Sequence, residues 1–150
     1  MKELGSILIA LLFAGVPTLS ASKINDPVMF VSEVLRHFAD TQSYQPPEDI
    51  YTPRLGKLFS DDRKRAKGEV GCLDFVFWVN GQDWTITKLD VKSGDSSQDR
   101  EIVIARFLNI DALQEIHFDF RRIAGRWLLD DVQSVKEPRW TLSEILKCSH

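Results

Sequence analysis

The second half of the chain alternates apolar and polar residues, and this pattern constrains the fold more than any other feature. From Trp84 the period becomes two, which is typical of β-strands that bury one face, and four stretches up to Val135 are predicted as strands, of which 116–121 alternates most cleanly. Short connections separate the stretches, so consecutive strands are expected to pair as antiparallel neighbours. The sequence therefore predicts a four-stranded antiparallel meander.

The expected strands are residues 84–91, 101–108, 116–121 and 127–135. Their connections are a polar loop at 93–99 and turns at 111–113 and 124–126. In the first strand the pair Lys88–Leu89 shifts the alternation, which indicates a β-bulge. In the last strand, Asp130 and Asp131 are expected to point to opposite faces of the sheet.

Two helices are predicted before the sheet. Each begins with a capping residue followed by proline, at Asp26–Pro27 and Thr52–Pro53, because the N–H that proline lacks has no partner in the first turn anyway. Apolar residues then recur at helical spacing, up to about Phe38 in the first helix and over 55–59 in the second. The basic run 63–67 is interpreted as a solvated helix end, where cations complement the helix dipole.

Residues 68–83 have no clean period and are predicted to form a buried, ordered loop or a short irregular strand, with a turn at Asn80–Gly81. At the other end, residues 141–144 have the pattern of a capping box that begins a short helix. Because helices and strands are segregated, the predicted class is α+β. The predicted architecture is a curled, cone-like antiparallel meander packed on the N-terminal helices, with a short C-terminal helix.

Residues 1–22 have the features of a secretory signal peptide: a basic start, an apolar run at 7–14, and small residues at 20–22. The run is about half of the roughly 20 residues that a membrane-spanning helix needs, so no span is expected in the mature chain. We therefore predict a signal peptide over 1–22, a single α+β domain over 23–150, and a periplasmic or secreted product.

Export determines how the two cysteines are interpreted. Cys72 and Cys148 allow only one intramolecular pair, and an oxidising compartment lets such a bridge persist, so a disulfide is predicted. The three histidines lack zinc-ligand spacing, and no metal site is expected. No dinucleotide or phosphate-loop motif is present, so no cofactor is expected. A net charge of −3 gives no general attraction for nucleic acid.

The irregular segment contains the candidate ligand-binding residues, which are Asp74, Trp78, Gln82, Asp83 and Trp84. A carboxylate buried beside these aromatic side chains would have a raised pKa and could act as a general acid or base. The alternative is structural. In that interpretation Gln82 and Asp83 satisfy backbone groups of the segment, and Trp84 seals the open end of the sheet.

A second set of candidates lies on the third expected strand. His117, Asp119 and Arg121 share the face opposite Ile116 and Phe118, and that face is outward if the aromatic side chains point into the core. The three residues are therefore either a solvated row or a polar recognition surface.

Residues 73–74, 80–84 and 125–132 resemble a family of exported bacterial proteins of unknown function within the nuclear-transport-factor-like (cystatin-like) α+β superfamily. The resemblance implies a cone whose last strand follows a glycine-then-tryptophan turn. Such a cone can hold a ligand, host an enzyme or serve as a binding module, so the fold does not define the function.

Three hypotheses follow. The first is an exported, non-catalytic binding protein with a protein partner in the cell envelope, such as an inhibitor or an immunity-type protein. The second is a binder of a small molecule at the mouth of the cone, lined by Phe75, Phe77, Trp78 and Trp84. The third is a hydrolase or isomerase that uses Asp74 or Asp83. Common catalytic motifs are absent from the sequence, which favours the first hypothesis.

Overall fold

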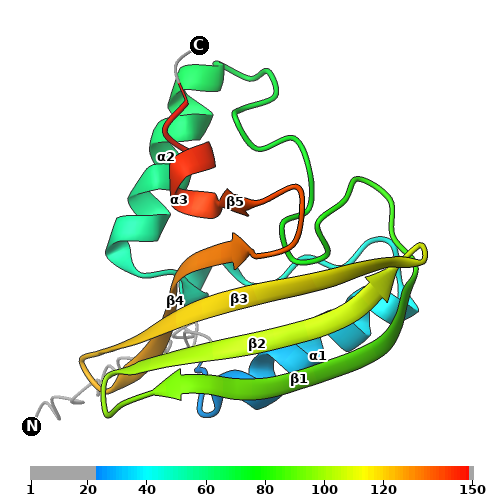
Figure 1. Cartoon of the computed structure of the whole chain (residues 1–150). Helices are drawn as coiled ribbons and strands as arrows, with labels where there is room; N and C mark the ends of the chain where they lie inside the picture. The colour runs from blue at the N-terminus through cyan, green and yellow to red at the C-terminus, as the bar shows by residue number, and fades with distance from the viewer. Residues whose placement is uncertain (1–22, 149–150) are drawn as a thin grey trace, which may run out of the picture.

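A computed structural model describes residues 23–148 of the chain (Figure 1). The elements are α1 (Pro27–Asp40), the 3-10 helix η1 (Glu48–Ile50), α2 (Pro53–Ala66), β1 (Ile86–Ser96), β2 (Arg100–Asn109), β3 (Ala112–Ile123), β4 (Arg126–Ser134), β5 (Trp140–Thr141) and α3 (Leu142–Ile145). The predicted signal peptide lies outside the described residues.

The strands form one open antiparallel sheet in the order β1-β2-β3-β4-β5, so the α+β class and the meander are confirmed. The sheet has five strands rather than the four predicted. After β4 the chain turns back, and Trp140 and Thr141 pair with Ser134 and Gln133. A strand of two residues is too short to produce an alternating pattern, so β5 has no periodic signal that could predict it.

The first strand is longer than predicted. It continues to Ser96, with Ser93 opposite Val103 and Ser96 opposite Glu101, through residues that the sequence assigned to a loop. These residues lie in an edge strand and are largely exposed, so they lack the apolar alternation that marks a half-buried strand. The predicted bulge is confirmed, because the register shifts at this point and Lys88 has a φ of 53°.

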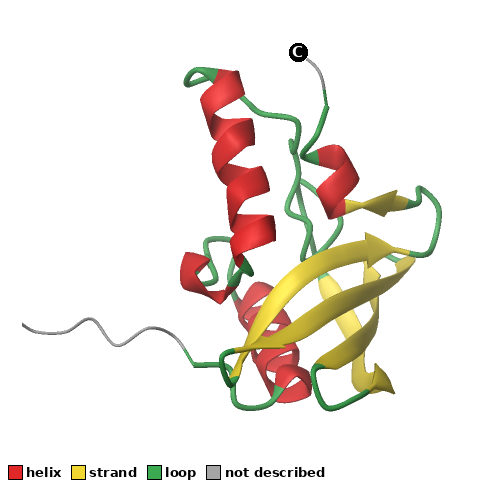
Figure 2. Cartoon of the chain, turned by 90° about the vertical axis from the view of Figure 1, so that its left-hand side faces the viewer, coloured by secondary structure: helices red, strands yellow, loops and turns green. Residues whose placement is uncertain are grey.

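The two long helices lie at different parts of the sheet (Figures 1 and 2). Helix α1 crosses behind β1 and β2 and buries the apolar stripe that contains Val31, Val34 and Phe38. Helix α2 stands at the β4 end of the sheet. Both helices begin as predicted, with the side chains of Asp26 and Thr52 accepting hydrogen bonds from backbone N–H groups three residues later.

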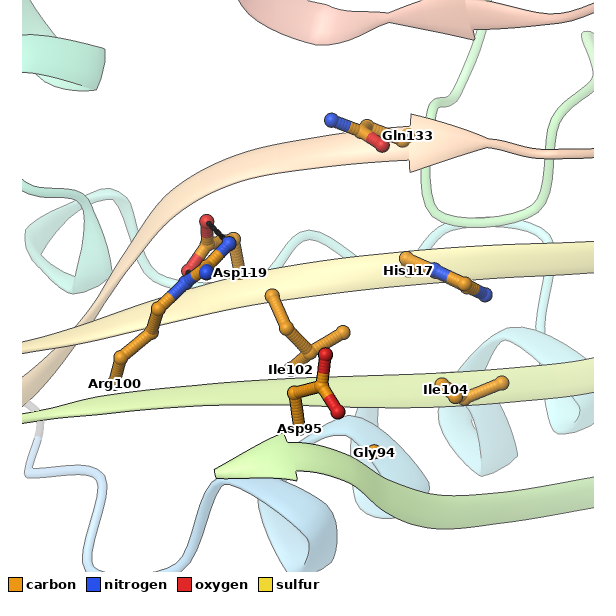
Figure 3. Close-up of a pocket in the computed structure, with 8 residues that line it drawn as sticks. All are labelled: Gly94, Asp95, Arg100, Ile102, Ile104, His117, Asp119 and Gln133. Atoms are coloured by element: carbon orange, nitrogen blue, oxygen red, sulfur yellow. Dashed lines mark hydrogen bonds and ion pairs between the residues drawn. The ribbon is translucent and has the colours of Figure 1, made fainter. Parts of the chain in front are cut away.

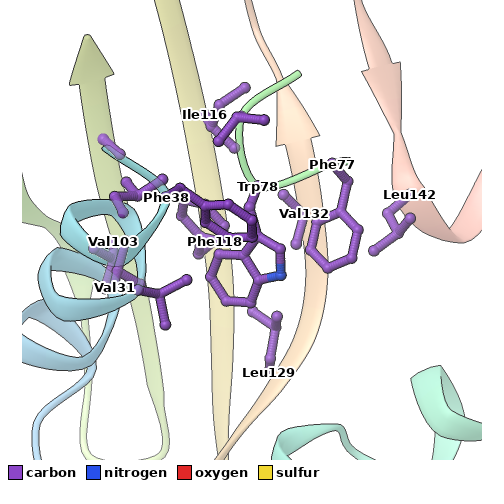
Figure 4. Packing of buried hydrophobic residues seen from close by; sticks show 14 of the residues in the cluster. Val31, Phe38, Phe77, Trp78, Val103, Ile116, Phe118, Leu129, Val132 and Leu142 are labelled. Atoms are coloured by element: carbon purple, nitrogen blue, oxygen red, sulfur yellow. The ribbon is translucent and has the colours of Figure 1, made fainter. Parts of the chain in front are cut away.

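The irregular segment between α2 and β1 is anchored in the core by Trp78 (Figure 4). The indole stacks on Phe118 of β3 with ring centroids 5.0 Å apart and on Phe77 at 5.2 Å. It also meets the edge of Phe30 from α1 at 6.3 Å. Aromatic pairs at these separations add to the free energy gained by burial. These ring contacts hold the irregular segment, which links α2 to β1, against both α1 and the sheet.

The capping box predicted at the C-terminal helix is wrong, although α3 begins where expected. The side chain of Thr141 makes no capping hydrogen bond. Instead, Asp131 of β4 accepts hydrogen bonds from the backbone N–H of Ser143, at 3.0 Å, and from its hydroxyl group. The acceptor for the helix start therefore comes from the neighbouring strand.

The predicted disulfide is confirmed. Cys72 and Cys148 are bonded, with their Cα atoms 5.9 Å apart, so the irregular segment is linked to the chain after α3. Next to the bridge, the buried carboxylate of Asp62 on α2 accepts a hydrogen bond from the backbone N–H of Cys72 at 3.0 Å. Arg65 donates to the carbonyl oxygen of Leu146. Helix α2, the irregular segment and the C-terminal residues are therefore joined at one place.

Removing the disulfide is expected to lower stability strongly. The bridge spans a sequence separation of 76 residues, and closing a loop of that length stabilises by about 4.5 kcal/mol in the chain-entropy model. The double variant Cys72→Ser/Cys148→Ser should lose roughly this much unfolding free energy in urea titrations. Wild-type protein measured with a reductant should match the variant. An unfolding midpoint that is unaffected by reduction would contradict the prediction.

Candidate functional site

Two surfaces of the domain are candidates for binding. We call the side of the sheet that faces away from α1 the open face. On β2, Val103, Ala105 and Phe107 are buried, whereas Ile102 and Ile104 alternate with them and lie on the open face. A depression of about 300 Å³ lies there (Figure 3), lined by Gly94, Asp95, Arg100, Ile102, Ile104, His117, Asp119 and Gln133.

Two isoleucines of β2 form the floor of this depression, and the other side chains that line it are polar (Figure 3). Ile102 and Ile104 are half-buried in the open face, and β1 passes beside them with a glycine at position 94. A Cβ atom on Gly94 would lie 2.9 Å from Cδ1 of Ile104 and 3.2 Å from the carbonyl oxygen of Ile102. Glycine therefore allows the side chain of Ile104 and the backbone at Ile102 to lie close to β1 without a side chain between them.

Paired charges border the floor at one end. Arg100 donates two hydrogen bonds to the carboxylate of Asp119, at 3.1 and 3.0 Å, in a bidentate arrangement. Arg121 approaches the same carboxylate at 3.4 Å. Bidentate arginine–carboxylate pairs are geometrically specific, so these side chains are held in place before any partner arrives. Asp119 and Arg121 are thus members of one network, as the sequence grouped them.

His117 belongs to a second cluster on the open face. Its Nε2 lies 2.9 Å from one carboxylate oxygen of Glu115, and Nε of Arg106 donates to the other oxygen at 2.8 Å. The hydrogen bond from Arg106, followed by that from His117, lowers the pKa of Glu115 from 4.5 to about 2. The histidine is therefore ordered by a neighbour on its own strand.

The charged network extends across β4 to α2. A register shift after Asp119 leaves Asp130 as an extra residue in β4. As a result Asp130 and Asp131 both reach Arg54, at 3.1 and 3.4 Å, although strict alternation predicted opposite faces. The bulge explains the difference, because one inserted residue changes the direction of the side chains that follow.

The second candidate surface is a groove of about 460 Å³ between the segment after α1 and the irregular segment. We call it the aromatic groove. Its lining residues are Phe38, Gln42, Ser43, Tyr44, Gln45, Pro46, Leu73, Phe75, Val76, Phe77, Trp78 and Trp84. Trp84 is held by its Nε1, which donates to the carbonyl oxygen of Phe38 at 2.8 Å. Tyr44 stacks on His37 with the ring centroids 4.6 Å apart.

The candidates that the sequence grouped around this groove are separated in the structure. Trp78 and Trp84 line the groove, but both are largely buried. Asp74, Gln82 and Asp83 are exposed. The hypothesis of a general acid or base required a carboxylate buried beside aromatic side chains, and neither Asp74 nor Asp83 is buried. Gln82 donates to the backbone carbonyl of Asp74 at 3.1 Å, which matches the structural interpretation of this residue.

Two asparagines that were not among the predicted functional residues fix the position of the irregular segment. Asn80 donates to Gln114 and accepts from the indole N–H of Trp140, both at 2.8 Å. Asn109 accepts from the backbone N–H of Thr85 and donates to the carbonyl of Val79, both at 3.0 Å. The Asn80–Gly81 turn signal was the only indication, and nothing in the sequence identified the distant partners.

Comparisons of the chain with family models, curated proteins and solved structures find no match. Among residues 23–148, no group of three or more His, Cys, Asp or Glu side chains is arranged to hold a metal ion. None of the helices in this part of the chain is long and apolar enough to span a membrane.

The Arg106–Glu115 pair should make stability depend on pH. Because the pKa of Glu115 is lowered on folding, its contribution to stability is complete above about pH 4.5 and is lost as the pH falls toward 2. The variant Arg106→Gln should lose part of this pH dependence, measured as the unfolding free energy in urea between pH 5 and pH 2.

The matched control is Arg139→Gln, which removes an exposed pair with Glu137. Exposed pairs contribute little, so this variant should keep the wild-type pH profile. The assignment would be wrong if the Arg106 and Arg139 variants had the same profile.

Proposed function

We propose that the chain is an exported, non-catalytic binding protein of the bacterial cell envelope, and that its open face binds another protein, as an inhibitor or immunity-type protein would. The observation that carries the proposal is the apolar floor of Ile102 and Ile104 bordered by charges that are already paired. Protein interfaces have this composition, with an apolar centre, a polar rim and an enrichment in arginine.

The pairing of the rim charges favours binding over solvation alone. Arg100, Asp119 and Arg121 hold one another, and so do Arg106 and Glu115. Side chains that are ordered before association lose less conformational entropy when a partner binds. The open face therefore offers a surface of defined shape and charge.

Three further features agree with export and with a cone-like module. Residues 1–22 have the composition of a signal peptide, and the Cys72–Cys148 disulfide is of a kind that persists in oxidising compartments. The sheet is an antiparallel meander with α1 on one side, as the resemblance to the nuclear-transport-factor-like superfamily implies. We propose membership of that superfamily on these grounds.

The proposal predicts that a charge at the floor of the open face abolishes partner binding. Immobilised wild-type protein should capture a partner from the envelope fraction of the cells that naturally produce it. The immobilised Ile104→Glu variant should not retain that partner. The control is Val70→Glu, the same kind of change at an apolar residue that is 70% exposed and outside the residues lining the depression. The proposal fails if wild type retains no specific protein, or if both variants retain it equally.

The aromatic groove supports a second candidate function, the binding of a small apolar molecule. Its volume of about 460 Å³ is within the usual range for ligand sites, roughly 300–1,000 Å³. Aromatic and aliphatic side chains form most of the lining, and Gln42, Ser43 and Gln45 supply polar groups at the edge. This mixture is typical of sites that bind an apolar body and orient it with a few hydrogen bonds.

Titration with the neutral fluorophore N-phenyl-1-naphthylamine tests the groove. Wild type should give a saturable increase in fluorescence, and Tyr44→Ala should weaken binding about tenfold, equivalent to about 1.4 kcal/mol. Tyr44→Phe keeps the ring that lines the groove and should bind the dye like wild type. Absence of saturation, or equal binding by the alanine variant, would exclude this function.

A further inference from the structure

The turns of two hairpins of the sheet have similar φ values but different sequences. The turn between β2 and β3 is Ile110–Asp111, with φ values of 46° and 66°. The turn between β3 and β4 is Ala124–Gly125, with φ values of 49° and 75°. Two-residue turns with positive φ at both positions favour asparagine, aspartate and glycine. The first turn therefore contains a residue type that the geometry disfavours.

Ile110 is the unusual residue. A β-branched side chain rarely adopts positive φ, because its Cβ substituents crowd the backbone. Burial does not compensate for this strain, since the residue is 60% exposed. Its backbone N–H donates to the carbonyl of Thr85 at 3.1 Å, a hydrogen bond that any residue except proline could make. Backbone strain that folding does not require is characteristic of functional positions.

The side chains beside Ile110 continue the open face. Leu113 is 54% exposed and pairs in register with Leu108. Leu108 lies an even number of residues after Ile102 and Ile104 on β2, so it points to the same open face. We call Ile110 and Leu113 the apolar tip. It projects at one end of the sheet, whereas the Ala124–Gly125 turn lies at the other (Figure 1).

The charged residue of the turn itself is acidic. Asp111 directly follows Ile110, and its side chain is exposed. Within residues 23–148 its carboxylate forms no ion pair. A binding site for the tip would therefore be apolar inside and basic at its edge.

We propose that the apolar tip inserts into a pocket of a partner protein that is lined by apolar side chains and bordered by lysine or arginine. This inference rests on the proposed function, because the apolar tip extends the same open face. It adds the location of the anchoring contact with the partner protein. Interfaces often depend on a few apolar anchors that fill pockets of the partner.

Two other occupants fit the tip less well. A two-fold contact with a second copy needs a self-complementary surface, and a projecting turn is not complementary to itself. An anionic membrane surface would be repelled by Asp111.

The first test asks whether the side chain of Ile110 stabilises the fold. Ile110→Asn should melt at the same temperature as wild type or higher, because asparagine adopts positive φ more easily than isoleucine. Ala124→Asn is the matched control at the other hairpin. A clear decrease in melting temperature for Ile110→Asn alone would mean that this side chain stabilises the fold, and it would overturn the proposal.

The second test identifies the contact. Photoreactive p-benzoylphenylalanine is placed separately at positions 110, 133 and 124 of the full chain in the producing cells, and crosslinked proteins are identified by mass spectrometry. Position 133 reports on the open face and position 124 is the control. We expect the same partner protein, different from this chain, to be crosslinked from positions 110 and 133, and no protein to be crosslinked from position 124. That protein, produced separately, should bind Ile110→Asn at least about tenfold more weakly than it binds wild type and Ala124→Asn.

The remaining outcomes distinguish the two proposals. A partner crosslinked at 133 but not at 110 overturns the anchor and leaves the proposed function in place. No specific protein at either position overturns both. Crosslinks from 110 only to a second copy of the chain or to lipid overturn the anchor, and so does an unchanged affinity of Ile110→Asn.

Discussion

The packing of Trp78 between α1 and the sheet is the contact on which the rest of the structure depends. It stacks on Phe118 and meets Phe30, so a segment without helix or strand is held inside the core. Irregular backbone needs partners for its polar groups, and Asn80 and Asn109 supply several of them. The aromatic groove exists because this segment is fixed opposite the residues that follow α1.

Regular elements with strong local signals could be predicted from the sequence. The alternation of Ile116, Phe118 and Phe120 defined β3 and its buried face, because one face of the strand must exclude water. Asp26 and Thr52 defined the starts of α1 and α2 through hydrogen bonds within one turn of helix. The disulfide followed from counting, since the two cysteines of the sequence allow a single intramolecular pairing.

Features that depend on contacts distant in sequence could not be predicted. Asp131, twelve residues before Ser143, caps α3 from another strand, and no local pattern encodes that. The extra residue in β4 brings Asp130 and Asp131 to Arg54, a partner 76 residues before Asp130 in the chain that no local pattern identifies. Asp74 and Asp83 were predicted as site residues because aromatic residues surround them in sequence, whereas both residues are exposed in the structure.

The strain at Ile110 can persist because the strands on both sides of it are fully paired. Every residue of β2 from Arg100 to Asn109 has a partner in β3, so the turn is determined by the register rather than by its own residues. Paired strands can impose a positive φ that the side chain disfavours, at a cost of about 1–3 kcal/mol for such a residue. A long, regular hairpin thus allows its turn to be selected for what it displays, and the exposed isoleucine is consistent with selection for contact rather than for folding.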